Sequence, residues 1–160
     1  MVRHTLAVLV ENQPGVLSHV AGLFARRGYN IESLAVGETE DNTISRITLV
    51  VDGDEKVIEQ VTKQLNKQVE VIKVNDITNE PSVDRHMLLI KVTADQVARQ
   101  EILQLMDIFR CRIVDIGRRS LIIEATGDEG KIEAIIQSLK PFGIKELVRT
   151  GKVALVRGSK

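Results

Sequence analysis

Apolar residues in the first half of the chain recur with two different periods. Residues 5–10 (TLAVLV) are apolar and rich in β-branched side chains, which is typical of a strand. The apolar residues after them recur at helical spacing, which predicts a helix ending at Gly28, and its stripe consists of Val16, Leu17, Val20, Ala21 and Phe24. Further strands are expected at 30–39, 43–52 and 69–77, with a second helix before the last of them. The predicted order is βαββαβ.

The same order of elements begins again after residues 78–84 (TNEPSVD), a polar stretch with Pro81 at its centre. In chain order, the expected elements lie at 87–92, 96–109, 112–116, 121–125, 132–139 and 144–149, with a further candidate strand at 153–156. We therefore expect one domain over 1–78, a linker over 79–84 and a second domain over 85–160. The two units share architecture but little sequence, which indicates a structural duplication.

Each βαββαβ unit is expected to fold as a ferredoxin-like α+β sandwich, with two helices on one face of a four-stranded antiparallel sheet. The other face of such a sheet then lacks cover. Consecutive apolar residues, as at Val50-Val51 and Val71-Ile72, indicate that this face or an edge is buried. A second subunit is the simplest cover, so we expect a homodimer.

Composition and charge exclude several classes of function. The 160 residues are 28% charged with a formal net charge of zero, and only 2% are aromatic, which argues against nucleic-acid binding. No apolar run approaches the ~18 residues that a membrane span requires, and the N-terminus does not resemble a signal peptide. The single cysteine, Cys111, cannot form an internal disulfide and fits a reducing compartment. We expect a cytoplasmic protein.

The turn between the first strand and the first helix carries the best candidates for ligand binding. Pro14 is expected at the start of the helix, where its missing N–H costs nothing. The N-terminus of a helix exposes unpaired N–H groups with partial positive charge. A ligand carboxylate can approach the backbone of Gly15 closely because this residue has no side chain. Asn12 can offer its amide oxygen to an ammonium group and its NH₂ to a carboxylate.

Asn30, at the start of the second strand, is expected beside the same helix, so that Asn12, Gly15 and Asn30 converge on one pocket. A zwitterion needs partners of both polarities without net charge, and asparagine supplies them. Apolar contacts for an aliphatic side chain would come from Val16, Leu17, Leu34 and Val36. These residues predict a pocket for a free amino acid. Because no catalytic constellation is found elsewhere, regulation is the expected output.

The same residues have a purely structural interpretation. Asn12 would then cap the helix, Pro14-Gly15 would form a turn, and Asn30 would only begin a strand. Asp52, Asp54 and Glu55 favour a turn and helix cap over a metal site, and the three histidines lack metal-ligand spacing. There is no GxGxxG, P-loop or G-x-S-x-G motif. We therefore expect no bound metal and no catalytic residues.

The βαββαβ order with this Pro-Gly turn resembles the ACT domain, a module that binds amino acids. More narrowly, HTLAVLVENQPGVLSHVAGLFARRGYNIESLAVGETED resembles the small regulatory subunits of acetolactate synthase, also called acetohydroxyacid synthase. GLFARRGYNIESL is the most specific part of this resemblance. It continues after the linker in RHMLLIKV, DIFRCRIVDI and RTGKVALVRG, so it covers nearly the whole chain. Those subunits also pair an ACT domain with a second βαββαβ domain.

The resemblance implies a site and a role. The family's effector pocket uses an Asn and a Gly of the strand-to-helix turn and an Asn after the first helix, matched here by Asn12, Gly15 and Asn30. It lies between two ACT domains of a homodimer, and valine is the usual feedback inhibitor. Gln13-Pro14 occupies positions that vary among relatives, and Pro14 should stiffen the turn without abolishing binding.

The resemblance also implies a partner. The large catalytic subunit carries thiamine diphosphate, magnesium and FAD, and it condenses two pyruvates to acetolactate in branched-chain amino acid biosynthesis. The small subunit has no catalytic site or cofactor of its own, raises that activity and makes it sensitive to valine, and its second domain is expected to contribute to docking. The alternative is a stand-alone ACT-domain sensor that acts on transcription or translation. The neutral net charge counts against that alternative.

Overall fold

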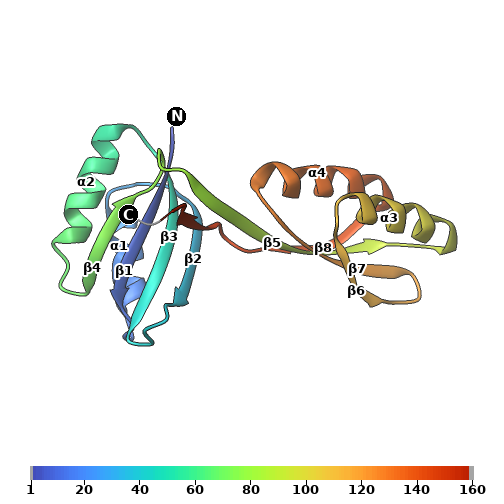
Figure 1. The fold of residues 1–160 in the computed structure, drawn as a ribbon, viewed down its shortest axis with the longest axis horizontal. Coiled ribbons are helices and arrows are strands. Elements are labelled where there is room, and N and C mark those ends of the chain that lie inside the picture. The colour runs from blue at the N-terminus through green and yellow to red at the C-terminus, as the bar shows by residue number, and fades with distance from the viewer. Residues whose placement is uncertain (1, 159–160) are drawn as a thin grey trace. The chain divides into compact units, whose positions relative to one another are not determined.

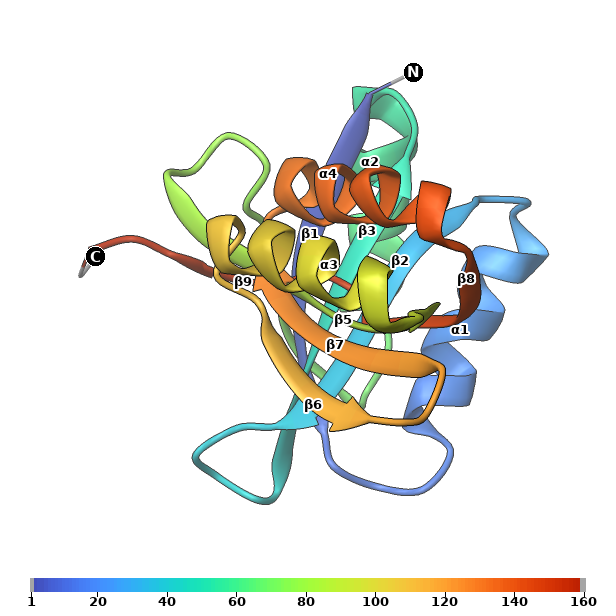
Figure 2. The same ribbon diagram turned by 90° about the vertical axis from the view of Figure 1, so that its right-hand side faces the viewer.

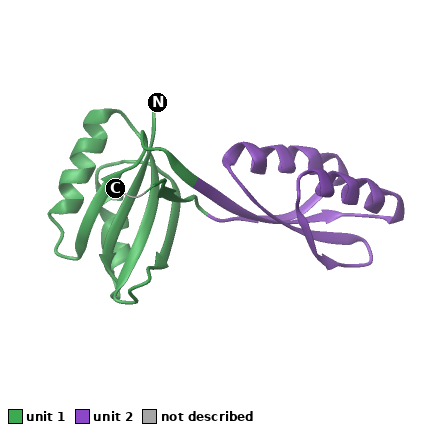
Figure 3. Ribbon diagram, in the orientation of Figure 1, with its two compact units in different colours: residues 1–83, 151–160 green, residues 84–150 purple. Residues whose placement is uncertain are grey.

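The computed structural model describes residues 2–158 of the chain. These residues form two compact units (Figure 3). Unit 1 contains residues 2–83 together with 151–158, and unit 2 contains residues 84–150. The chain therefore leaves unit 1, forms the whole of unit 2 and then returns to unit 1.

Unit 1 is a four-stranded antiparallel sheet with two helices (Figure 1). Its elements are β1 (Arg3–Glu11), α1 (Val16–Arg26), β2 (Ile31–Glu38), β3 (Ile44–Asp52), α2 (Glu55–Asn66) and β4 (Val71–Asp76). The strand order is β2-β3-β1-β4, so β2 and β4 form the edges of the sheet. This is the predicted ferredoxin-like arrangement, with the helices packed on one face.

The core of unit 1 lies between the sheet and its helices. Alternate residues of the central strands point into it, as the period of two requires, while α1 and α2 each contribute one apolar stripe. The fully enclosed members are Leu6, Val8, Val10, Val16, Val20, Phe24, Ile47, Leu49, Val51, Ile58, Val61 and Leu65. Phe24 is the largest of them, and its ring meets Tyr29 edge-on with the centroids 6.5 Å apart. With no tryptophan in the chain, aliphatic packing supplies most of this core.

Unit 2 repeats the topology of unit 1. Its elements are β5 (Ser82–Thr93), α3 (Gln96–Ile108), β6 (Arg112–Ile116), β7 (Ser120–Gly127), α4 (Glu129–Leu139), a 3₁₀ turn η1 (Lys140–Phe142) and β8 (Ile144–Arg149). The order β6-β7-β5-β8 places these four strands as β2-β3-β1-β4 are placed in unit 1, and a fifth strand, β9 (Val153–Val156), pairs with β5. Figure 2 shows α3 and α4 side by side over this sheet. Two tandem ferredoxin-like folds are therefore confirmed.

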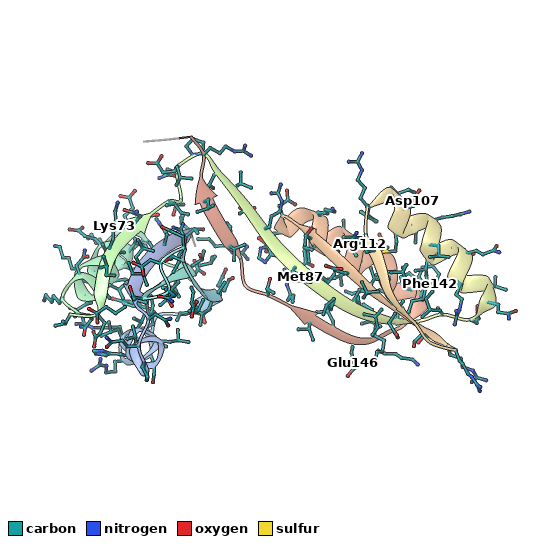
Figure 4. All side chains as sticks on the ribbon, turned by 60° about the horizontal axis from the view of Figure 1, so that its bottom comes forward. Lys73, Met87, Asp107, Arg112, Phe142 and Glu146 are labelled. Atoms are coloured by element: carbon teal, nitrogen blue, oxygen red, sulfur yellow. The ribbon has the colours of Figure 1, made fainter. Side chains whose placement is uncertain are left out.

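The helix-free face of the unit 2 sheet carries both charged and exposed apolar residues, since Leu89 (40% exposed) lies opposite Val148 (66% exposed) on it. Register places Arg112 opposite Glu124, and the Lys91 ammonium lies 3.0 Å from a Glu146 carboxylate oxygen. Met87 and Glu146, labelled in Figure 4, belong to the paired strands β5 and β8. Cross-strand pairs of opposite charge suit a face in contact with water. The single cysteine, Cys111, instead packs half-buried against the core of unit 2, where burial raises the pKa of its thiol.

The predicted domain boundaries differ from the units at two places. β5 begins at Ser82, inside the stretch 79–84 that was expected to be a linker. The second domain was expected to continue to residue 160, but residues 151–158 pack with unit 1. The physical reason is the short strand β9 (Val153–Val156), whose Ala154 is only 5% exposed. Ala154 packs in a small apolar cluster with Ala7 and Ile77, so the final segment contributes to the burial of unit 1.

This packing also changes the expectation about the second face of the first sheet. β9 lies across the helix-free face of the unit 1 sheet (Figure 1), and Arg46 of β3 donates a hydrogen bond to the carbonyl of Ala154 at 2.9 Å. The expected cover was a second subunit. The structure instead shows cover from the chain's own C-terminal segment, so a homodimer has to be argued from another surface.

We predict that Phe24→Ala lowers the free energy of unfolding of unit 1 by about 3–5 kcal/mol, because it leaves a cavity at a fully enclosed site. Urea denaturation followed by circular dichroism measures the change. Val69→Ala is the matched control, since Val69 is 89% exposed and its loss should change stability by less than about 0.5 kcal/mol. Equal effects of the two substitutions would contradict the assignment of the core.

The carboxyl of Asp76 makes stability depend on acid pH. Its oxygens accept hydrogen bonds from the Thr78 hydroxyl, from the Thr78 N–H at 3.0 Å and from His4 Nδ1 at 3.1 Å. Burial raises the pKa of Asp76, but these hydrogen bonds lower it by more, so the pKa lies below its ordinary value. The ionised carboxylate therefore stabilises the fold above the unfolded pKa, and this contribution is lost as the pH falls through the lower folded pKa.

We predict that Asp76→Asn flattens the pH dependence of the unfolding free energy below about pH 4, where the native chain loses this contribution. Urea midpoints measured at a series of acid pH values test the prediction. Asp115→Asn, at an exposed position in β6, serves as the control in the same buffers. Identical acid dependence in the native chain and Asp76→Asn would show that this carboxylate carries no such stabilisation.

Candidate functional site

The turn between β1 and α1 depends on the backbone of Gly15. Gly15 is the N-cap of α1 with φ 86°, in the left-handed region that glycine adopts without steric cost. A Cβ built on Gly15 would meet no atom within 4 Å, so glycine is required for the backbone angle and not for space. The helix begins at Val16, two residues later than the start expected at Pro14. Pro14 lies exposed in the turn before the cap.

The N-terminus of α1 differs from those of the other three α-helices within residues 2–158. In α2, α3 and α4 the N-cap is Asp54, Asp95 and Asp128, and each carboxylate accepts a hydrogen bond from the backbone N–H three positions later. Gly15 has no side chain that can accept in this way, and the first turn of α1 contains no acidic residue. The Val16 N–H donates to the Gln13 carbonyl at 3.4 Å, but no side chain caps the later N–H groups of this turn, which keep their partial positive charge.

This geometry corrects the expected role of Asn12. The purely structural interpretation made Asn12 the helix cap, but the cap residue is Gly15. Its other parts are confirmed, because Pro14 and Gly15 lie in a turn and Asn30 directly precedes β2. The Asn12 amide Nδ2 donates instead to the carbonyl of Asn42 at 2.8 Å and to Glu38 Oε1 at 3.2 Å. Both amide hydrogens are therefore engaged, and the expectation that they would bind a ligand carboxylate is wrong. The amide oxygen remains the group that Asn12 can offer, and it suits an ammonium.

Sequence reasoning missed the contribution of the β2–β3 hairpin. Glu38, which ends β2, holds the Asn12 amide and brings a carboxylate to the turn. Asp41 lies in the same hairpin, and hydrogen bonds from the side chain and backbone N–H of Thr43 lower its pKa. The hairpin therefore brings negative charge to the turn that precedes α1. The acidic run ETED (Glu38 to Asp41) was the signal in the sequence, but the expected fold gave no reason to pair it with Asn12.

Asn30 does not lie near Asn12 in one chain, so the expected convergence is wrong within a single chain. Register aligns His4 with Val51 and Val51 with Ile31, which places the start of β2 level with the start of β1. Asn12 follows the end of β1, eight residues beyond His4, or about 26 Å along a strand. The topology explains this distance, because α1 carries the chain back along the sheet before β2 begins.

The four apolar residues expected at the site separate into two groups. Val16 is 6% exposed and packs in the core of unit 1, so it cannot contact a ligand. The other three are accessible, with exposed fractions of 41% for Leu17, 37% for Leu34 and 45% for Val36. Leu34 and Val36 lie opposite the core residues Leu49 and Ile47, hence on the helix side of the sheet at its β2 edge. Leu34 and Val36 lie on the edge strand β2, and Leu17 lies in the first turn of α1. These three accessible residues are called here the aliphatic strip.

The corresponding place in unit 2 has different chemistry. A hollow of about 520 Å³ lies there between α3 and the β6–β7 hairpin, lined by Gln96, Arg99, Ile116, Gly117 and Arg118. The first turn of α3 is already capped by Asp95. Arg99 donates hydrogen bonds to the carbonyls of Gly117 and Arg118 and so ties the hairpin to the helix. The hollow in unit 2 therefore lies beside a capped helix end, unlike the turn before α1.

Other candidates have structural roles. Asp54 caps α2, as its sequence position predicts, and His19 lies 3.3 Å from Glu70 Oε1. Over residues 2–158 there is no cluster of three His, Cys, Asp or Glu side chains suited to a metal ion. Within the same range, no helix is both long and apolar enough to cross a membrane.

Comparison with known proteins covers both units. The family model for the AHAS small subunit-like ACT domain matches residues 6–73. The family model for the small subunit of acetolactate synthase matches residues 85–158. The first match falls on unit 1, and the second covers unit 2 together with the C-terminal segment that packs with unit 1.

Individual relatives match along the whole chain. A probable acetolactate synthase small subunit of Archaeoglobus fulgidus is 62% identical over 159 residues, which cover 99% of each chain. The acetolactate synthase small subunit of Mycobacterium bovis is 51% identical over 97% of this chain and 92% of its own. The crystal structure of the acetolactate synthase small subunit from Thermotoga maritima, 47% identical, aligns over 100% of both chains with a TM-score of 0.93. The chain therefore belongs to the family of acetolactate synthase small subunits.

Proposed function

We propose that this small subunit binds valine at the β1–α1 turn and makes its catalytic partner sensitive to that amino acid. As a regulatory small subunit of acetolactate synthase, it pairs with a catalytic subunit. The proposal adds that the partner uses thiamine diphosphate, magnesium and FAD to condense two pyruvates to acetolactate in the cytoplasm. This chain raises that activity and contributes no catalytic group or cofactor of its own.

The observation that carries the proposal is the helix N-terminus without a side-chain cap, next to an amide oxygen and a carboxylate. The first turn of α1 offers N–H groups to a ligand carboxylate. The amide oxygen of Asn12 and the carboxylate of Glu38 suit the ammonium of the same ligand. The aliphatic strip of Leu17, Leu34 and Val36 suits a branched apolar side chain. Together these groups match a branched aliphatic amino acid.

We further propose that a second copy of this chain completes the site. β2 is an edge strand, so its outer N–H and C=O groups can pair with another strand. Two β2 strands paired antiparallel about a two-fold axis would place the start of one beside the end of the other. Asn30 of one chain would then lie beside Glu38 of the other, and Glu38 holds Asn12. The asparagines that lie far apart in one chain would meet across the dimer.

Such a site couples binding to the arrangement of the dimer. A ligand that contacts both chains favours the dimer arrangement in which both sets of contacts form, because ligands shift only states that they bind unequally. A coupling free energy of about 1–3 kcal/mol is enough for feedback control. Discrimination between valine and its homologues should be limited, since one methylene contributes about 1–3 kcal/mol.

We predict that Asn30→Ala and Gly15→Asp each abolish valine inhibition of the reconstituted enzyme while activation is retained. Gly15→Asp places the protein's own carboxylate where the ligand carboxylate should bind, and aspartate tolerates the left-handed backbone better than most residues. Steady-state assays with and without valine measure both properties.

Two matched controls accompany these variants. Gly158→Asp changes another glycine with a left-handed backbone, φ 77°, and open space around it. Asn66→Ala changes an exposed asparagine at the end of α2. Both controls should remain sensitive to valine. Full valine sensitivity in Asn30→Ala or Gly15→Asp would mean that the effector binds elsewhere.

Mixed dimers test whether the site is shared between chains. Neither Asn12→Ala nor Asn30→Ala should bind valine alone. In a random mixture of the two, a heterodimer contains one site with both asparagines intact, so about one quarter of all sites should recover. The stoichiometry from calorimetric titration of the co-refolded mixture gives this fraction. No recovery, with heterodimers verified by mass spectrometry, would contradict a site shared between two chains.

A further inference from the structure

The C-terminal segment of residues 151–157, called here the strap, holds the backbone of β2. Gly151 packs directly on the backbone of Leu34, where an added Cβ would lie 2.3 Å from the Leu34 carbonyl oxygen. The next residue, Lys152, donates its backbone N–H to the Ser33 hydroxyl oxygen at 2.8 Å. The strap therefore contacts β2 at two consecutive residues.

The strap also contacts the other strands of the unit 1 sheet. Arg46 of β3 donates to the carbonyl of Ala154 at 2.9 Å, and Lys152 Nζ lies 3.4 Å from the Thr5 hydroxyl of β1. Ala154 and Val156 pack with Ala7 and Ile77. Beyond them, the N–H of Arg157 donates to the carbonyl of Pro81 at 2.7 Å. These contacts, made along its whole length, show that the strap packs on the unit 1 sheet.

The residues of this face allow a strand to lie flat on the sheet. On the strands beneath the strap, small or hydroxyl-bearing residues alternate with the large residues of the core. Thr5, Ala7 and Thr48 are 8%, 4% and 3% exposed, so the face is buried within one chain. The face is thus built for a backbone that approaches closely, which Gly151 permits.

The strap continues directly from the last residue of unit 2. β8 ends at Arg149, and the next residue, Thr150, exchanges hydrogen bonds with Met87 of β5. The Thr150 N–H donates to the Met87 carbonyl at 2.9 Å, and the Met87 N–H donates to the Thr150 hydroxyl oxygen at 2.9 Å. Thr150 is thus held by unit 2, while Gly151 and Lys152 are held by β2. Held residues therefore follow one another directly along the chain, with Thr150 in unit 2 and Gly151 and Lys152 in unit 1.

We propose that the strap is the route by which an effector bound at the β2 edge acts on unit 2. This inference depends on the proposed function, because β2 carries Leu34 and Val36 and begins directly after Asn30. A ligand that changes the position or mobility of β2 must carry the strap with it or break its contacts. The strap residues touch no ligand in this account. They are positioning residues that connect β2 with the end of β8.

Two neighbouring residues of the strap provide a matched test. Ala154 is 5% exposed and faces the sheet, whereas Leu155 is 64% exposed. Ala154→Lys places a charge at a buried position next to the guanidinium of Arg46 and should lift the strap. Leu155→Lys adds the same side chain on the exposed side and should leave the strap docked. Gly151→Val lifts the strap by a second mechanism, through the contact of its Cβ with Leu34.

The experiment uses the full chain, alone and reconstituted with its catalytic subunit. Amide hydrogen exchange of residues 31–38 reports whether β2 is held, calorimetry reports valine binding, and steady-state assays report activation and inhibition. In Ala154→Lys and Gly151→Val we expect faster amide exchange in β2. Both variants should still activate the catalytic subunit and bind valine within about threefold of the affinity of the native chain. Valine should no longer inhibit the enzyme, so the ratio of uninhibited to inhibited activity should be about one. Leu155→Lys should match the native chain in every measurement.

Each other outcome has a defined meaning. Equal exchange of β2 in Ala154→Lys and Leu155→Lys would overturn the claim that the strap holds β2. Faster exchange with undiminished valine inhibition would overturn its role in coupling. A native chain that fails to bind valine would contradict the proposed function, while the exchange comparison would still decide whether the strap holds β2.

Discussion

The left-handed backbone at Gly15 is the constraint on which the proposed site depends. It starts α1 without a side-chain cap, so no side chain of the protein closes the positive end of the helix. The same turn directs Asn12 toward the β2–β3 hairpin, where its amide meets Glu38 and Asn42. One end of the sheet thereby carries the N-terminus of α1, the amide oxygen of Asn12 and the carboxylate of Glu38. Any other residue at Gly15 would strain the turn, and an aspartate there would also close the anion site.

The two units show how one topology can carry two different sites. Both have the same strand order and two helices on one face. In unit 2 the helix corresponding to α1 is capped by Asp95, and Arg99 ties it to the neighbouring hairpin. The Asp95 carboxylate accepts from one N–H of that first turn, so the positive end of α3 is partly neutralised. Corresponding places in the two units therefore differ in chemistry, although the fold is the same.

Periodicity and turn chemistry predicted the elements and the ferredoxin-like fold because those signals are local. The Asp54 cap was predicted for the same reason. The positions of Asn12 and Asn30 relative to each other depend on register and chain direction, which no local signal encodes. Likewise, the pattern of VALV predicts a strand at 153–156 but not the sheet on which it packs. Val16 was assigned to the ligand because helical spacing does not say which stripe residue faces the core and which lies at its border.

Backbone amide chemical shifts of the isotopically labelled full chain, recorded during titration with valine, test the central claim most directly. The account predicts that the N–H signals of Leu17 and Ser18, in the first turn of α1, and the side-chain amide of Asn30 shift together. The first-turn signals of α3, Val97 and Ala98, should change far less. Valine-dependent shifts concentrated at α3, with α1 and Asn30 unchanged, would contradict the account.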